Sequence, residues 1–237
     1  MQHLLLLHGA LGDAGQLQPL AAALSHQYII HTLNFNGHGG EQKVDQFSIP
    51  LFAEQVQEYL KKNNIDKINI FGYSMGGYVA LYVARQYPER IQKIFTLATK
   101  FMWTPAIAQQ EIKMLDAGKI IEKLPAFAQA LEKRHAPNDW KKLLQKTAEL
   151  MINLGNDPPL NDTDFEKMEL PVLVGIGDKD AMVTLEETIQ VYRKLKNANL
   201  IVLPKTPHPI EKVNVERLAK EIELFFKSET TKTVPAN

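Results

Sequence analysis

Six short apolar runs alternate with amphipathic stretches along this chain of 237 residues, and this alternation limits its fold more than any other feature. Each run is continuously apolar, as is typical of strands that are buried on both faces of a sheet. Strand and helix in alternation predict a mostly parallel six-stranded sheet with helices on both faces, joined by right-handed crossovers. The expected strands are 3–7, 28–35, 67–72, 91–98, 171–176 and 199–203, and the expected helices are 14–25, 50–63, 75–87, 184–196 and 211–227.

The segment 101–168 interrupts this rhythm because it contains no convincing strand. About 65 residues between two strands are far too many for a simple crossover. We therefore expect a helical lid inserted into an α/β core formed by residues 1–100 and 169–237. An additional packing layer without a role in function is the alternative. The expected helical runs are 106–116, 119–134 and 138–154, and a turn at 154–162 closes the segment.

The charge and composition of the chain argue against several classes of partner. Lys and Arg number 27 together, as do Asp and Glu, so the formal net charge is zero, and we expect no nucleic acid and no membrane partner. The chain has no cysteine, which excludes disulfides and thiolate ligands and fits a cytoplasmic location. No apolar run approaches the roughly 20 residues that span a bilayer. The polar residues 228–237 are expected to form a flexible tail.

The stretch Gly72-Tyr73-Ser74-Met75-Gly76 fits the pattern G-x-S-x-G. It follows an apolar run and opens an amphipathic one, which is the strand–turn–helix setting that a nucleophile elbow requires. A serine on such a turn is strained, so the positions two before and two after it must be small, and glycine occupies both. We predict that Ser74 is a nucleophile. A glycine-rich turn with an unreactive serine is the alternative.

A serine is a poor nucleophile without a general base. Of the seven histidines, only His208 comes just beyond the last expected strand, in the stretch LPKTPHPIEKV. A loop there lies at the carboxyl edge of a parallel sheet, as does Ser74, and Pro207 and Pro209 stiffen it. We predict that His208 is the base. A surface histidine in a proline-rich turn is the alternative.

The imidazole of a catalytic histidine needs an acid that fixes its tautomer. The stretch VLVGIGDKDAMV places Asp178 and Asp180 directly after a buried strand. Asp178 lies where the chain leaves the sheet, and aspartates at such positions commonly accept N–H bonds within the turn. Asp180 lies further into the loop, where its side chain can reach the loop of His208. We therefore predict that Asp180 orients His208, whereas Asp178 has a structural role.

An oxyanion hole needs a second backbone N–H from the loop after the first strand. The stretch LLLLHGALGDAG supplies a glycine-containing turn there, and we assign the two N–H donors to Ala10 and Met75. Met75 also begins the helix after Ser74, and a helix N-terminus carries the positive end of the helix dipole. We expect a structural or hydrogen-bonding role for His8, and we expect His38, in the turn NFNGHGG, to be a loop histidine.

These motifs resemble those of α/β-hydrolase-fold proteins of the capped esterase/lipase type, and the resemblance covers nearly the whole chain. It rests on the H-G loop, the N-G-H-G turn, the run G-Y-S-M-G-G, the pattern G-x-x-D-x-x-V and the late histidine. It implies a triad of Ser74, Asp180 and His208 and no cofactor. Two departures stand out: the strand near residue 3 resembles the third strand of the family sheet, and Pro207 precedes the histidine where the family often has glycine.

The resemblance and the motifs together predict a serine hydrolase that cleaves a carboxylic ester or thioester of a small to medium, partly apolar substrate. Serine at the elbow argues against the dehalogenases and epoxide hydrolases of the same fold, in which the family has aspartate there. A C–C hydrolase, a lyase or a cofactor-free haloperoxidase with the same triad is an alternative. A non-enzymatic ligand receptor of the same fold is another.

Phe101 and Trp103 directly follow a strand end, so we expect them near Ser74, in contact with the substrate.

No H-E-x-x-H motif or cluster of ligands predicts a metal site. The expected partner is therefore a small-molecule substrate alone, and a homodimer is left open.

Overall fold

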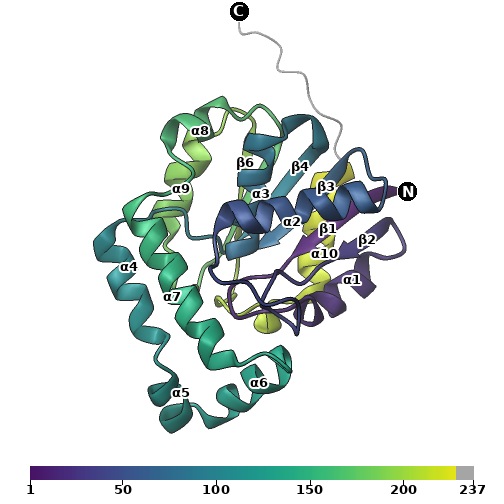
Figure 1. The fold of residues 1–237 in the computed structure, drawn as a ribbon. Helices are drawn as coiled ribbons and strands as arrows, with labels where there is room; N and C mark the ends of the chain where they lie inside the picture. Colours follow the sequence, from purple (N-terminus) through teal and green to yellow (C-terminus); the bar gives the residue numbers. More distant parts are fainter. Residues whose placement is uncertain (228–237) are drawn as a thin grey trace, which may run out of the picture.

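The computed structural model describes residues 1–227, which form one parallel sheet in the strand order β2-β1-β3-β4-β5-β6 (Figure 1). Every neighbouring pair is parallel, which confirms the predicted fold class. Only β2 is clearly shorter than expected, because residues 33–35 leave the sheet. The strands are β1 (Gln2–Leu7), β2 (Tyr28–Thr32), β3 (Ile68–Tyr73), β4 (Ile91–Leu97), β5 (Val172–Gly177) and β6 (Ala198–Leu203).

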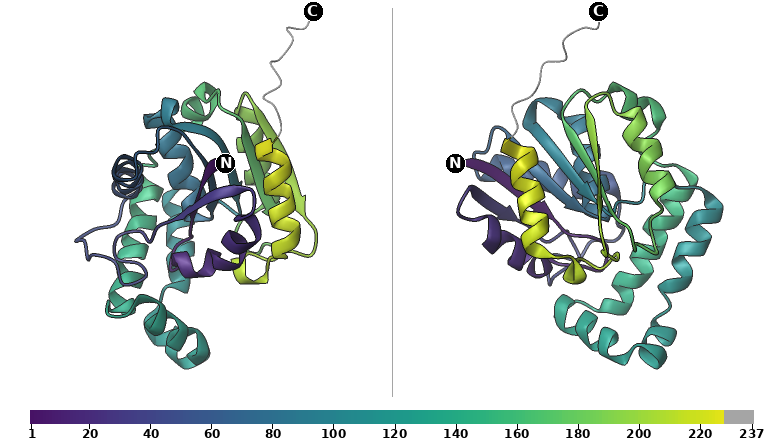
Figure 2. Two further views of the ribbon diagram at one scale, coloured as in Figure 1. Left: turned by 90° about the vertical axis from the view of Figure 1, so that its right-hand side faces the viewer. Right: turned by 180° about the vertical axis from the view of Figure 1, so that it is seen from behind.

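Helices cover both faces of the sheet, as two separate views confirm (Figure 2). One face packs against α1 (Gln18–Leu24) and α10 (Val215–Lys227), whose apolar residues form one core cluster with β1 and β4. The other face packs against α2 (Ile49–Lys62), α3 (Met75–Gln86) and α9 (Leu185–Lys194), which form the second cluster. The central strands are therefore buried on both sides, in accordance with their continuous apolar sequences.

The last helix begins four residues later than its sequence pattern predicts. Residues Ile210–Lys212 form a short 3₁₀ turn, and α10 starts only at Val215. The side chain of Asn214 accepts the N–H of Arg217 and so provides the polar start that the amino end of a helix requires. Glu211 therefore belongs to the loop that carries His208, not to α10.

The 101–168 segment, called the insertion below, forms helices and contains no strand. The expected run 119–134 is divided at Leu124, because Pro125 can begin a helix but cannot continue one. The short helix at its end was not expected, although a capping box of Asn161 and Asp164 marks its start. The helices are α4 (Pro105–Glu111), α5 (Ala117–Lys123), α6 (Pro125–His135), α7 (Trp140–Asn156) and α8 (Asp162–Lys167).

The insertion lies beyond the carboxyl ends of the central strands (Figures 1 and 2). Its helix α4 packs along α7, and α5 packs against α6. Among residues 1–227, no helix is both long and apolar enough to cross a membrane. The predicted flexible tail, 228–237, lies outside the described residues.

Candidate active site

Ser74 sits at the junction of β3 and α3 in a backbone conformation that a residue with a side chain rarely adopts, with φ 51° and ψ −119°. Its N–H donates to the Leu97 carbonyl over 2.8 Å, and its own carbonyl accepts the hydroxyl of Thr99 over 3.0 Å. Although Ser74 is the N-cap residue of α3, its side chain makes no capping hydrogen bond. The turn is thus held from the end of the neighbouring strand β4 and the loop after it, and the Ser74 hydroxyl is left available for chemistry.

The glycines on either side of Ser74 are required by close backbone contacts. A Cβ atom on Gly72 would lie 2.5 Å from the Gly76 carbonyl oxygen, and one on Gly76 would lie 2.5 Å from the Leu7 carbonyl oxygen. Atoms of the main chain cannot move aside as the end of a flexible side chain can. The G-x-S-x-G spacing therefore follows from the tight packing of the elbow against α3 and β1.

The N–H groups assigned to the oxyanion hole belong to residues beside Ser74. Ala10 and Met75 line the same cavity as Ser74, and in the described part of the chain neither N–H donates to another backbone or side-chain group. Ala10 belongs to a turn closed by a hydrogen bond from Gly12 N–H to the Gly9 carbonyl, 3.1 Å long. Met75 is the first residue of α3, where helix N–H groups have no partner within the helix.

Asp180 and His208 form a hydrogen-bonded pair across the loops that follow β5 and β6. Asp180 Oδ2 lies 2.8 Å from His208 Nδ1, and the Asp180 side chain is only 1% exposed. Burial by itself would raise the pKa of Asp180, but hydrogen bonds from His208, Val183 and Met182 outweigh it and lower the pKa. Asp180 is thus a carboxylate at neutral pH and accepts the Nδ1–H of His208, which leaves His208 Nε2 as the acceptor for a proton.

Two further residues hold the loop of His208 in place. Asp178 Oδ1 accepts the N–H of Thr206 over 3.1 Å, so Asp178 joins the loop after β5 to the loop after β6. The Tyr73 hydroxyl donates to the His208 carbonyl over 2.9 Å. Burial raises the pKa of Tyr73, so its phenol stays protonated and able to donate. Tyr73 had not been singled out in the sequence, although its place directly before Ser74 could have suggested a supporting role.

Three other histidines are fully buried and lie in one cluster. His8 Nε2 accepts the N–H of Phe35, and its Nδ1 pairs with the Gly9 carbonyl, so both ring nitrogens are occupied, as the structural role predicted for His8 requires. The ring of His38 lies between the other two: its centroid is 5.2 Å from that of His8 and 5.8 Å from that of His135. Burial is the main cause that lowers the pKa of His8 to about 4 and that of His38 well below its usual value. None of the three lines the cavity beside Ser74.

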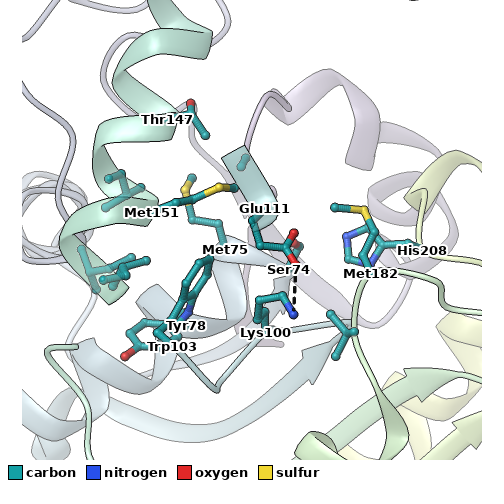
Figure 3. Close-up of a pocket in the computed structure, with 15 residues that line it drawn as sticks. Ser74, Met75, Tyr78, Lys100, Trp103, Glu111, Thr147, Met151, Met182 and His208 are labelled. Carbon is teal, nitrogen blue, oxygen red and sulfur yellow. Dashed lines mark ion pairs between the residues drawn. The ribbon is translucent and has the colours of Figure 1, made fainter. Parts of the chain in front are cut away.

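An apolar cavity adjoins Ser74 and His208 (Figure 3). We call it the inner cavity, because buried residues of α3 and α7 form much of its wall. Trp103 lines it, which leaves its predicted contact with the substrate open, but Phe101 does not: its ring is buried against Phe165, with centroids 6.1 Å apart. Residues 101–104 belong to no helix or strand, so no regular alternation puts the two rings on one side. The lining includes Met75, Tyr78, Thr147, Leu150, Met151, Leu154 and Met182.

One ion pair stands on the wall of this apolar cavity (Figure 3). Lys100 Nζ lies 3.3 Å from Glu111 at the end of α4 and 3.5 Å from Glu187 in α9. All three side chains are largely buried. Glu187 also accepts the N–H of Phe101, so the cluster joins the insertion to the core directly beside Ser74. The position of Lys100 just after β4 is the only sequence signal that could have suggested it.

A second, wider depression of about 1420 Å³ shares Ser74 and His208 with the inner cavity. We call it the outer groove, because it opens between the loop of His208 and helices α5 and α6. Several large apolar side chains that are exposed on the molecule line it: Met114, Leu124, Phe127 and Met182. Residues 1–227 contain no cluster of three or more His, Cys, Asp or Glu side chains that could hold a metal ion.

Comparison with known proteins gives two kinds of similarity. A family model described as alpha/beta hydrolase fold matches residues 2–118. The pimeloyl-[acyl-carrier protein] methyl ester esterase of Aeromonas hydrophila is 28% identical over 229 residues, which cover 86% of this chain and 87% of that protein. The protein of the same name from Neisseria meningitidis (strain FAM18) is 24% identical over 223 residues, with 86% and 85% covered.

Solved structures share the fold at low sequence identity. The enol-lactonase from Burkholderia xenovorans superimposes with a TM-score of 0.78 at 18% identity, over 96% of this chain and 92% of that one. A thermophilic esterase from Thermogutta terrifontis gives a TM-score of 0.74 at 20% identity, over 96% and 90% of the two chains. At such identities the likeness establishes the architecture of the chain and nothing finer.

Proposed function

Since this chain is an α/β-hydrolase-fold protein, we propose that it is a serine hydrolase that cleaves a carboxylic ester or thioester through an acyl-enzyme intermediate. One observation supports this above all others. Ser74, strained and with its hydroxyl free of capping, shares a cavity with His208, whose Nδ1 is bonded to the buried carboxylate of Asp180. A serine activated by a base that is itself oriented by an acid is the arrangement that acyl transfer requires.

The reaction would proceed in two balanced steps. In the first, the Ser74 oxygen attacks the carbonyl carbon of the substrate while His208 Nε2 takes the proton of the Ser74 hydroxyl. The resulting oxyanion accepts hydrogen bonds from the N–H groups of Ala10 and Met75. The proton then passes from His208 to the leaving oxygen or sulfur as its bond to carbon breaks. In the second step water repeats the sequence, releases the acid and restores Ser74. Asp180 stays ionised and stabilises the imidazolium that forms twice in the cycle.

The two hollows beside Ser74 suggest how the substrate is divided. His208 protonates the leaving group, and the outer groove continues from His208 along Pro209 and Glu211, so we assign the leaving group to this groove. The inner cavity, lined by Tyr78, Trp103 and the apolar side of α7, would hold the acyl part. The largely apolar lining of this cavity suits a partly apolar acyl group.

The named relatives agree with ester chemistry, since the Aeromonas and Neisseria proteins are methyl ester esterases by name. In this proposal the insertion serves as a cap over the site, the substrate is a small molecule, and the reaction takes place in the cytoplasm. The chemistry described above uses no metal or cofactor. Substrate profiling on esters, thioesters and C–C substrates distinguishes this proposal from the other reactions that a triad of this kind can perform.

Replacement of Ser74 by alanine tests the proposal. The Ser74→Ala variant should lose turnover of aryl esters by a factor on the order of 10⁴ or more, and it should no longer be labelled by a fluorophosphonate probe. Its melting temperature should stay near that of the wild type. Ser25→Ala, at an exposed serine in the loop after α1, is the matched control and should keep both activity and labelling. Stoichiometric labelling of the Ser74 variant, or a wild-type protein without multiple turnover, would overturn the proposal.

A further inference from the structure

The end of helix α6 in the insertion is hydrogen-bonded to the turn that carries Ala10. The last two residues of this helix, Arg134 and His135, both meet the carbonyl oxygen of Leu11: Arg134 Nη1 donates to it over 3.0 Å, and His135 Nε2 lies 3.1 Å from it. Leu11 directly follows Ala10 and has a positive φ of 58°, which leucine adopts only when its surroundings hold it there. These two donors are on a helix more than a hundred residues away in the sequence.

The imidazole of His135 joins this turn to a second loop. Its Nδ1 accepts the N–H of Gly39 over 3.1 Å, so its Nε2 must carry the hydrogen that is donated to Leu11. The ring is fully buried, and burial is the main cause that lowers the pKa of His135, so the neutral ring persists at neutral pH. One side chain of the insertion thereby fixes two loops of the core.

The guanidinium of Arg134 extends the same connection to the loop of His208. Arg134 Nε lies 3.7 Å from an oxygen of Asp13, and Arg134 Nη2 lies 3.4 Å from an oxygen of Glu211. Asp13 follows the turn of Leu11, and Glu211 comes three residues after His208. A planar guanidinium can donate in several fixed directions at once, which the ammonium of lysine cannot do.

We propose that Arg134 and His135 are positioning residues, which hold the turn of Ala10 and the loop of His208 in the relative placement that catalysis needs. This inference rests on the serine hydrolase function proposed above. Without these donors, no group of the insertion holds the carbonyl of the strained Leu11, and the turn can relax. A shift of the Ala10 N–H would then weaken the oxyanion hole, because such donors act through their preorganised geometry. The insertion would therefore contribute to catalysis as well as covering the site.

The test uses Arg134→Ala, Arg134→Lys and His135→Leu, with Lys133→Ala as the matched control. Lys133 is exposed on the same turn of α6, so its replacement removes a positive charge and no contact of the loops. With a short aryl ester, which does not extend far into the outer groove, we expect kcat to fall roughly 10- to 100-fold in Arg134→Ala and KM to change much less. Arg134→Lys should restore part of the loss. Lys133→Ala should behave as the wild type.

A second readout separates positioning from a general loss of structure. A trifluoromethyl ketone forms a tetrahedral adduct with an active serine, and its affinity should fall by about the same factor as kcat. Amide hydrogen exchange should become faster at residues 9–12 in Arg134→Ala and His135→Leu, while the core strands stay protected. Equal kcat, equal adduct affinity and unchanged exchange at 9–12 in these variants would overturn the inference. Failure of the proposed function would appear instead in the wild type, as turnover that does not depend on Ser74.

Discussion

Asp180 Oδ2 lies 2.8 Å from His208 Nδ1, although the two residues are 28 positions apart and follow different strands. The other oxygen of the same carboxylate, Oδ1, accepts the N–H groups of Met182 and Val183 over 2.8 and 2.9 Å. Turn hydrogen bonds of the kind expected for Asp178 are therefore made by Asp180. They fix the carboxylate so that its second oxygen faces the imidazole.

The two aspartates should respond differently to the same substitution. Asp180→Asn should lower kcat on the order of 10³–10⁴-fold and leave the fold intact, because an amide does not hold the imidazole in the required tautomer. Asp178→Asn should reduce the free energy of unfolding by about 1 kcal/mol through its weaker bond to Thr206, with a smaller effect on kcat. Steady-state kinetics and urea denaturation of both variants measure the two effects. A large loss of kcat in Asp178→Asn beside a nearly normal Asp180→Asn would reverse the assignment.

Replacement of Gly76 tests the steric requirement of the elbow, and replacement of Gly118 is the matched control. Gly76→Ala should destabilise the protein by about 1–3 kcal/mol and remove activity, because its Cβ would lie 2.5 Å from the Leu7 carbonyl oxygen. Gly118→Ala is the control, since the nearest contact of a Cβ there is an Asp116 carboxylate oxygen at 3.3 Å. Gly118 lies within α5, so its replacement should change stability by less than about 1 kcal/mol. Thermal melts decide the matter, and a stable, active Gly76 variant would contradict the role given to the elbow.

Trp103 should determine selectivity for the acyl group, whereas Phe101 should not. Trp103→Ala enlarges the inner cavity, so its kcat/KM should change unequally along a series of aryl esters of increasing acyl length. Phe101→Leu should cost about 1 kcal/mol of stability and leave the order of preference unchanged, because its ring is packed against Phe165. A uniform change of kcat/KM in the Trp103 variant would place the acyl group elsewhere.

The buried histidines should make the protein less stable in mild acid. Burial lowers the pKa of His8 from its usual 6.5 to about 4, so between these values the unfolded chain binds a proton that the folded chain does not. Stability from this source is therefore complete above about pH 6.5 and is lost as the pH falls toward about 4. From about pH 7.5 to about pH 5.5, His8 alone should account for a loss of about 1 kcal/mol in the free energy of unfolding.

Urea denaturation at several pH values tests this expectation. His8→Gln should be less stable than the wild type at neutral pH, because it loses its fitted hydrogen bonds, but its stability should fall less on acidification. His26→Gln is the control, since the His26 side chain is 63% exposed and lies outside the buried cluster of His8, His38 and His135. Identical slopes for His8→Gln and the wild type would show that His8 is not the source of the effect.

The sequence by itself determined the features that depend on short stretches of chain. Continuous apolar runs can only be satisfied by burial on both faces of a sheet, so the six strands and their parallel arrangement were predictable. The elbow was predictable because its steric requirement falls on positions two residues from Ser74. Breaks at proline are equally local, although the division of 119–134 before Pro125 and the late start of α10 were missed, since helix boundaries depend on caps that compete with periodicity.

Only the tertiary structure decided which distant groups meet. The places of Asp178 and Asp180 in their loop suggested which of them serves His208, but their partners, Thr206 and His208, each lie 28 residues away and are brought to them by the fold. Likewise, two residues of one short stretch, Phe101 and Trp103, separate into core and cavity according to what packs beside them. The bonds from the end of α6 to Leu11 had no signal in the sequence, because a backbone carbonyl is the same at every residue. Whether it is reached by a distant side chain depends on the packing of the whole chain.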